Sequence, residues 1–206
     1  MVPALAYTAA WMLMIAAMML PTTLPILAVF RRVVTGNARA GRLYAVVVAG
    51  FLCAWFAFGI AAYALDWTLH AAARETTWFI ANGWMVGAAV IGGAGLFQFS
   101  ALKYRCLDKC RSPVAFTLGR WRGSRPRAEA LALGLRHGLF CLGCCWSLML
   151  LMFAVGIGSI GWMLMLAAVM AIEKNASWGR RVSAPVGVVL LVWAAVLVAA
   201  GTTGAV

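Results

Sequence analysis

Long apolar blocks dominate the sequence, and several of them approach the ~20 residues that a helix needs to cross the ~30 Å hydrocarbon core of a membrane. Of the 206 residues, 65% are apolar and only 11% are charged. A soluble domain of this size needs far more polar surface to stay in solution. The pattern therefore predicts an all-α fold, a polytopic transmembrane helical bundle that forms a single domain over residues 1–206.

Six of these blocks are assigned as membrane spans. They cover residues 5–30, 43–65, 78–100, 138–155, 162–178 and 185–201. All lysines and arginines except Arg74 fall in the first, third and fifth connections between the spans or, for Lys174, near the end of the span that leads into the fifth connection. The positive-inside rule makes these connections cytoplasmic, so both termini are predicted to be extracytoplasmic. We expect a multi-pass protein of the bacterial cytoplasmic (inner) membrane, whose longest cytoplasmic connection is the basic segment 101–136.

The net charge of +12 follows from this topology. It predicts the lipid bilayer as a partner and argues against nucleic acid.

Prolines and glycines indicate where the helices bend or pack closely. Pro21 and Pro25 are expected to break the inner end of the first span. Gly83 and Gly87 form a small-xxx-small pair that is typical of close helix packing, continued by Gly92, Gly93 and Gly95 in the same span.

The strongest chemical signal is a run of three cysteines that follows a histidine. His137, Cys141, Cys144 and Cys145 share one face of a helix with 3.6 residues per turn. Thiolates suit soft metal ions and also thiol redox chemistry. A buried cysteine can equally be a small apolar residue of the core, but three within five positions favour a functional site.

A second pair, Cys106 and Cys110, lies in the basic connection 101–136, one helical turn apart. A permanent disulfide is not expected in the reducing cytoplasm. The spacing leaves open a metal-accepting dithiol, a transient redox pair, or no special role.

Glu173, followed by Lys174 and Asn175, is the third signal because it falls in the fifth span, about 16 Å below the outer boundary. A charge at that depth usually faces a partner, a cavity or a pathway. Neighbours on a helix point apart, so Glu173 is expected to meet another helix or a cation rather than Lys174. The alternative is that the helix ends at Ile172 and the charges extend to the membrane surface.

Methionines accompany a short internal repeat. Residues 11–19 and 162–170 are nearly identical, each starting with Trp and ending with Met. Thioethers can fill gaps in a core or bind Cu(I). Met18, Met19 and Met170 are the candidate ligands, because the last two occupy matching positions in the repeat.

Four motifs together have the pattern of a known family. They are Met-Met-Leu-Pro ending at Pro21, Cys-Leu-x-x-Cys-Arg-x-Pro ending at Pro113, Cys-x-Gly-Cys-Cys-Trp ending at Trp146, and Glu173-Lys174. The chain resembles the bacterial predicted metal-binding integral membrane proteins, a family without an established activity. The resemblance implies a membrane protein that binds a metal.

The leading hypothesis favours a non-enzymatic role, that of an integral membrane protein that binds a soft transition metal, Cu(I) first, for transport, delivery or insertion. Cys106 and Cys110 would exchange the ion at the cytoplasmic face. The metal would be held inside the bundle by Cys141, Cys144 and Cys145, assisted by His137, Glu173, Met18, Met19 and Met170. The recipient would be a cytoplasmic or periplasmic metal-accepting protein or a larger membrane complex.

Two alternatives from other classes remain. The first is a membrane thiol–disulfide oxidoreductase that relays electrons between the two cysteine groups. The second is an accessory subunit that assembles or stabilises another membrane complex.

Overall fold

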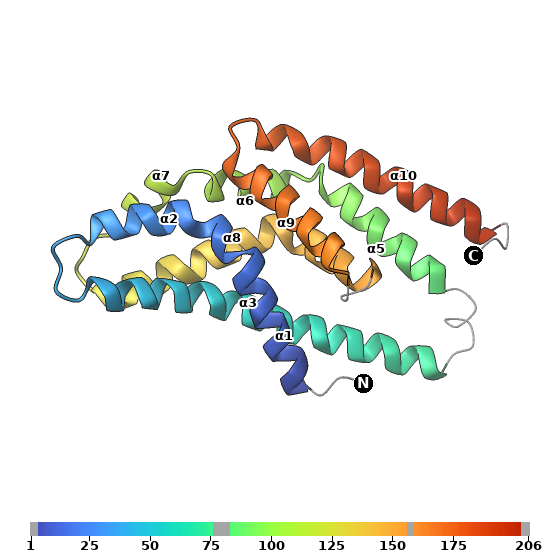
Figure 1. Ribbon diagram of the computed structural model, residues 1–206, viewed down its shortest axis with the longest axis horizontal. Helices are drawn as coiled ribbons and strands as arrows, with labels where there is room; N and C mark the ends of the chain where they lie inside the picture. The colour runs from blue at the N-terminus through green and yellow to red at the C-terminus, as the bar shows by residue number, and fades with distance from the viewer. Residues whose placement is uncertain (1–3, 76–82, 156–158, 203–206) are drawn as a thin grey trace. The chain divides into compact units, whose positions relative to one another are not determined.

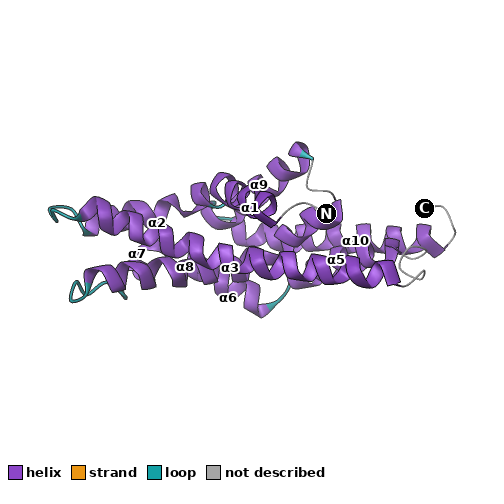
Figure 2. Cartoon of the chain, turned by 90° about the horizontal axis from the view of Figure 1, so that it is seen from below, coloured by secondary structure: helices purple, strands orange, loops and turns teal. Residues whose placement is uncertain are grey.

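The structure, a computed structural model, describes residues 4–75, 83–155 and 159–202, and every regular element in these ranges is helical (Figures 1 and 2). The all-α prediction is therefore confirmed for the described part of the chain. The elements are α1 (Ala4–Met18), α2 (Leu20–Val33), α3 (Ala40–Glu75), α5 (Gly83–Phe97), α6 (Ala101–Cys110), α7 (Pro113–Leu118), α8 (Pro126–Val155), α9 (Ile160–Asn175), the 3₁₀ turn η1 (Gly179–Val182) and α10 (Ser183–Thr202).

Three of the described segments are long and apolar enough to cross a membrane without a break: Ala40–Leu69 in α3, Pro126–Met152 in α8, and Gly179–Thr202, which joins η1 to α10. The number rises to five if each of two bent helix pairs, α1 with α2 and α5 with α6, counts as one span. α9 has 16 residues, which gives about 24 Å of helix, less than the hydrocarbon thickness. The count of six spans and the outward placement of both termini therefore stay predictions.

Helix ends differ from the predicted span ends because hydropathy marks only the apolar part of a helix. α8 begins at Pro126, twelve positions before the predicted span at residue 138. Proline is favoured in the first helical turn, and Glu129 accepts hydrogen bonds from the backbone N–H groups of Arg122 (2.8 Å), Gly123 (2.7 Å) and Arg125 (3.0 Å). Residues 78–82 of the predicted third span lie outside the described residues.

The first predicted span is a bent pair, in which α1 and α2 meet at Met19 at an angle of 60°. Pro21 lies in the first turn of α2, where its missing N–H has least effect. The hydroxyl of Thr22 donates to the carbonyl oxygen of Met19 (2.8 Å), and that of Thr23 to Leu20 (2.7 Å). The helix break predicted from Pro21 is confirmed, whereas Pro25 lies inside α2, which continues past it to Val33.

The chain forms two compact units. Unit 1 comprises Met1–Tyr63 and Arg105–Gly143, and unit 2 comprises Ala64–Tyr104 and Cys144–Val206. Three helices, α3, α6 and α8, contribute residues to both units.

In unit 1, α3 and α8 approach so closely that glycine is needed at the contact. A Cβ atom at Gly134 would collide with the carbonyl oxygen of Val47. A Cβ at Gly50 would lie 2.7 Å from the carbonyl oxygen of Leu131, and one at Gly138 would lie 3.0 Å from that of Phe51. A buried apolar cluster lies in unit 1 near the beginnings of α3 and α8, with members Ile26, Leu27, Phe30, Val34, Leu43, Val47, Phe116, Ala130 and Leu133.

In unit 2, α5 packs along α10, and the two helices run side by side (Figure 1). A Cβ at Gly95 would lie 3.0 Å from the Leu191 side chain and 3.1 Å from the carbonyl oxygen of Gly187. No described atom comes within 4 Å of a Cβ built at Gly83 or Gly87. The close-packing role predicted for Gly95 is confirmed, whereas the structure does not place the Gly83–Gly87 pair at a helix contact within its described residues.

Candidate functional site

The three cysteines of the central run lie on α8, which continues as one helix from Pro126 to Val155. Cys141, Cys144 and Cys145 are buried, with 0%, 1% and 1% of their surfaces exposed. None of the six cysteines, all of which lie in described residues, forms a disulfide bond. The helical placement of the run, predicted from its spacing, is confirmed.

His137 lies one turn before Cys141 and is buried in unit 1. Its imidazole stacks on the ring of Phe51 at 5.6 Å between centroids and meets the edge of Phe116 at 5.8 Å. The histidine is therefore packed among aromatic rings. Its role as a metal ligand stays a prediction.

Cys106 of α6 packs against α8 beside the cysteine run. A Cβ at Gly143 would lie 2.6 Å from the Cys106 Sγ, so a larger residue at this position would force the sulfur away from the α8 backbone. Gly143 is flanked in the sequence by Cys141 on one side and Cys144 on the other. The glycine of the Cys-x-Gly-Cys-Cys motif thus has a physical reason: it seats the thiol of a second helix.

The Cys106–Cys110 pair does lie on one helical turn, since α6 spans both residues. Their environments differ, because Cys106 is buried and Cys110 is only partly so. Cys106 is therefore the more enclosed of the two thiols, and the use of the pair in metal exchange or redox chemistry stays a prediction.

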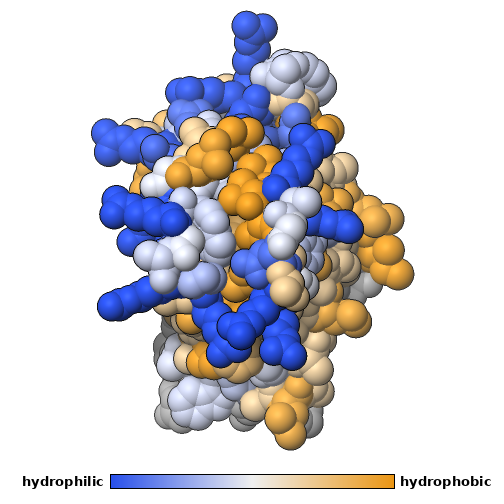
Figure 3. Space-filling view, turned by 90° about the vertical axis from the view of Figure 1, so that its left-hand side faces the viewer, coloured by the Kyte–Doolittle hydropathy of each residue, from blue (hydrophilic) through white to orange (hydrophobic). Residues whose placement is uncertain are grey.

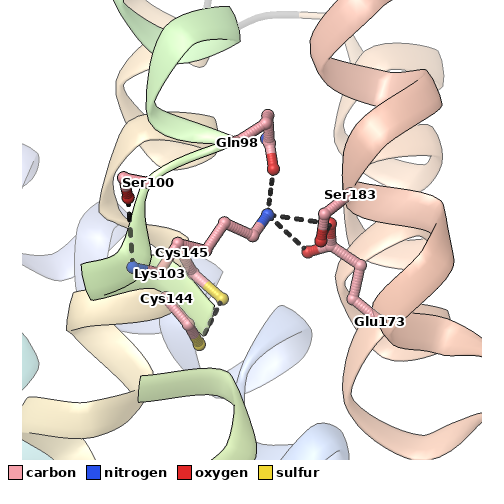
Figure 4. A network of polar contacts seen from close by, with 7 residues as sticks. All are labelled: Gln98, Ser100, Lys103, Cys144, Cys145, Glu173 and Ser183. Atoms are coloured by element: carbon pink, nitrogen blue, oxygen red, sulfur yellow. Dashed lines mark hydrogen bonds and ion pairs between the residues drawn. The ribbon is translucent and has the colours of Figure 1, made fainter. Parts of the chain in front are cut away.

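In unit 2, the Sγ atoms of Cys144 and Cys145 are 3.3 Å apart (Figure 4). Neighbouring residues on a helix normally point in different directions, so this short separation brings two thiols to one place. Paired thiols are suited to hold one soft cation or to undergo oxidation together.

The candidate methionines are buried within their own units. Met18 is 6% and Met19 0% exposed in unit 1, and Met170 is 0% exposed in unit 2. Met19 and Met170 are the last residues of the two repeat copies, so the repeat carries the same degree of burial at this position. Their convergence on one metal ion stays a prediction.

Glu173 is 1% exposed near the end of α9, which continues past Ile172 to Asn175. Its carboxylate accepts hydrogen bonds from Lys103 Nζ at 2.8 and 2.9 Å and from Ser183 Oγ at 2.7 Å (Figure 4). Lys103 Nζ also donates to the Gln98 side-chain carbonyl. Glu173 therefore meets a cation from another helix, as the sequence predicted, and that cation belongs to the protein.

Sequence reasoning missed Lys103, which it had counted among the charges of the basic connection. The lysine is 0% exposed, and its backbone N–H is hydrogen bonded to Ser100 Oγ at the start of α6 (3.1 Å). One signal was available: Gln98 is a polar residue among apolar neighbours inside the predicted third span, and Lys103 lies only three residues beyond the end of that span. A buried acid needs such a partner, because an isolated charge in an apolar medium is very costly.

Within the described residues, no three His, Cys, Asp or Glu side chains gather closely enough to form a ready-made metal site. The soft donors are instead distributed as Cys106 and Cys141 in unit 1 and the Cys144–Cys145 pair in unit 2. Thiolates and thioethers are the donors that select Cu(I), so the available side chains fit this ion in kind.

These features define a class of protein: an all-helical chain with several helices apolar enough to cross a membrane and with soft sulfur donors buried among them. The chain belongs to the PpoB2 copper chaperone family, whose sequence profile matches residues 8–197. No curated protein and no solved structure matches the chain. Family membership confirms the copper part of the sequence prediction.

Proposed function

We propose that this protein is a membrane-embedded copper chaperone that binds Cu(I) through buried thiols and passes it to a metal-accepting protein or membrane complex. The observation that carries the proposal is the seating of the Cys106 sulfur against Gly143, within the run that holds Cys141, Cys144 and Cys145. In unit 1, α6 and α8 thus each place a thiol, Cys106 and Cys141, near the same stretch of α8. The apolar helices support placement in a membrane, for which we propose the bacterial cytoplasmic membrane.

The donors act in sequence in this proposal. Cys110, the more exposed thiol of α6, exchanges copper at the cytoplasmic side, and Cys106 lies one turn further into the protein. Cys141, Cys144 and Cys145 then hold the ion, with His137, Met18, Met19, Met170 and Glu173 as further candidate ligands. A carrier must release the copper ion again, so ligation by pairs of thiols suits it better than a site that surrounds the ion completely.

Copper content after thiol removal tests the proposal. We expect the purified wild-type protein, loaded with Cu(I) under reducing conditions, to retain copper. The Cys141→Ser/Cys144→Ser/Cys145→Ser variant should lose most of it, since a hydroxyl is a hard donor that binds Cu(I) poorly. Elemental analysis of the protein peak measures the metal-to-protein ratio.

The matched control is Cys53→Ser, which removes a lone exposed thiol on α3 and should leave the copper content unchanged. Thermal unfolding of all three proteins must show that the triple variant is folded. Equal copper in the wild type and in the folded triple variant would contradict the proposal.

The 3.3 Å separation of the Cys144 and Cys145 sulfurs favours one alternative, a membrane thiol–disulfide oxidoreductase. In that case, the thiols would form a disulfide bond reversibly as the ratio of oxidised to reduced glutathione changes, without bound metal. Alkylation trapping over a series of glutathione ratios distinguishes the two. Redox-dependent pairing in copper-free protein supports the oxidoreductase, and thiols that stay reduced but are protected by Cu(I) support the chaperone.

A further inference from the structure

A cavity of about 590 Å³ opens at the end of unit 1 where α3 and α8 begin. Figure 3 faces this end of the molecule and shows hydrophilic side chains around an apolar strip. Four arginines line the cavity together with apolar side chains, and none of its described lining residues is acidic. The residues on which the argument depends are Arg39, Arg42, Arg125, Arg127, Leu43 and Val46.

The one negative charge of Glu129, which follows the lining residue Ala128 in the sequence, leaves the four arginines in excess. Glu129 lies in the first turn of α8, and its two carboxylate oxygens accept four hydrogen bonds from residues 122–125. The carboxylate is thus turned into the loop before α8. Asn37, which also lines the cavity, accepts a hydrogen bond from the backbone N–H of Arg39 (2.8 Å) just before α3 begins.

We propose that this cavity, named here the arginine recess, binds the phosphate groups of an anionic phospholipid. Guanidinium groups bind phosphate oxygens in pairs of parallel hydrogen bonds, which a single ammonium cannot do. Four guanidinium groups around one recess can bind more than one phosphate group. A lipid with two phosphodiester groups is therefore the best fit.

The source of the phosphate is a lipid because the recess combines charge with an apolar floor. Leu43 and Val46 lie in the Ala40–Leu69 segment of α3, and Arg127 lies in the Pro126–Met152 segment of α8, both apolar enough to span a membrane. The arginines thus lie at the ends of these segments, at the level of lipid headgroups. Basic pockets at helix ends on the cytoplasmic side are known to bind such headgroups, whereas a free phosphate ion makes no use of an apolar floor.

This inference rests on the membrane placement of the proposed function, but not on the copper chemistry. Native mass spectrometry of the detergent-solubilised protein, titrated with cardiolipin, phosphatidylglycerol or phosphatidylcholine, measures the lipid affinities. We expect the wild type to bind the two anionic lipids at least about tenfold more tightly than phosphatidylcholine. Replacing all four arginines by glutamine (Arg39→Gln, Arg42→Gln, Arg125→Gln and Arg127→Gln) should abolish that preference.

The matched control has the same loss of charge at four arginines that do not line the recess: Arg31→Gln, Arg32→Gln, Arg105→Gln and Arg122→Gln. This control should keep the preference. The inference is overturned if both quadruple variants lose it equally, if the recess variant keeps it, or if millimolar inorganic phosphate displaces the bound lipid from the wild type. Copper content of the same samples is expected to be unchanged, so failure of the lipid inference is distinguished from failure of the copper proposal.

Discussion

Replacement of Lys103 by methionine is expected to lower the free energy of unfolding by about 3–5 kcal/mol, because it leaves a buried charge without its partner. The Glu173 carboxylate is 1% exposed and receives two of its three described hydrogen bonds from Lys103 Nζ. Methionine keeps the length and apolar character of the lysine stem but donates no hydrogen bond. Thermal unfolding in a defined detergent, with recovery of monodisperse protein, measures the loss.

Two controls separate loss of the charge pair from a general effect of the substitution. Lys109→Met makes the same change on an exposed residue of the same helix and should alter stability by no more than about 0.5 kcal/mol. The double variant Lys103→Met/Glu173→Leu removes both charges and should recover most of the stability, since apolar residues can replace a buried ion pair. A single Lys103→Met variant as stable as the wild type would show that the pair does not hold the fold.

The double variant also tests the role of Glu173 in metal binding. If it folds and keeps its copper, the carboxylate serves the structure alone. If it folds and loses copper, Glu173 takes part in holding the ion, as the sequence predicted, and Lys103 then neutralises it in the copper-free state.

The elements that could be predicted from sequence are those whose signal is local. Long apolar runs indicated helices, and Pro21 indicated the break at Met19, because each depends on neighbours along the chain. The number of membrane crossings could not be predicted in this way. Bent pairs and the short α9 show that a run of apolar residues fixes neither the helix axis nor its length.

Side-chain partners depend on how the helices pack, so local sequence patterns predict them less well. The spacing of Cys141, Cys144 and Cys145 indicated a shared helix, but nothing in the sequence paired Cys106 with Gly143. The burial of Lys103 was not predicted, because the lysine lies in a segment rich in basic residues. The Gly134–Gly138 pair went unnoticed because it lies beside Arg136 and His137, where polar residues obscure the membrane signal, whereas the purely apolar surroundings of Gly83 and Gly87 made that pair conspicuous.

Replacement of Gly134 by alanine is expected to lower the free energy of unfolding by about 1–3 kcal/mol or more, as overpacking of a close contact does. The added Cβ would collide with the carbonyl oxygen of Val47, which belongs to the α3 backbone and cannot rotate away as a flexible side chain can. Helix propensity works in the opposite direction, since alanine is favoured over glycine by roughly 0.5–1 kcal/mol within a helix. Gly87→Ala is therefore the matched control: it gains the propensity in α5, where no described atom lies within 4 Å of the new Cβ, and should be neutral or stabilising. If Gly134→Ala unfolds at the same temperature as Gly87→Ala, α3 and α8 are not in backbone contact, and the helix pair that positions Cys141 and the seat of Cys106 is built differently.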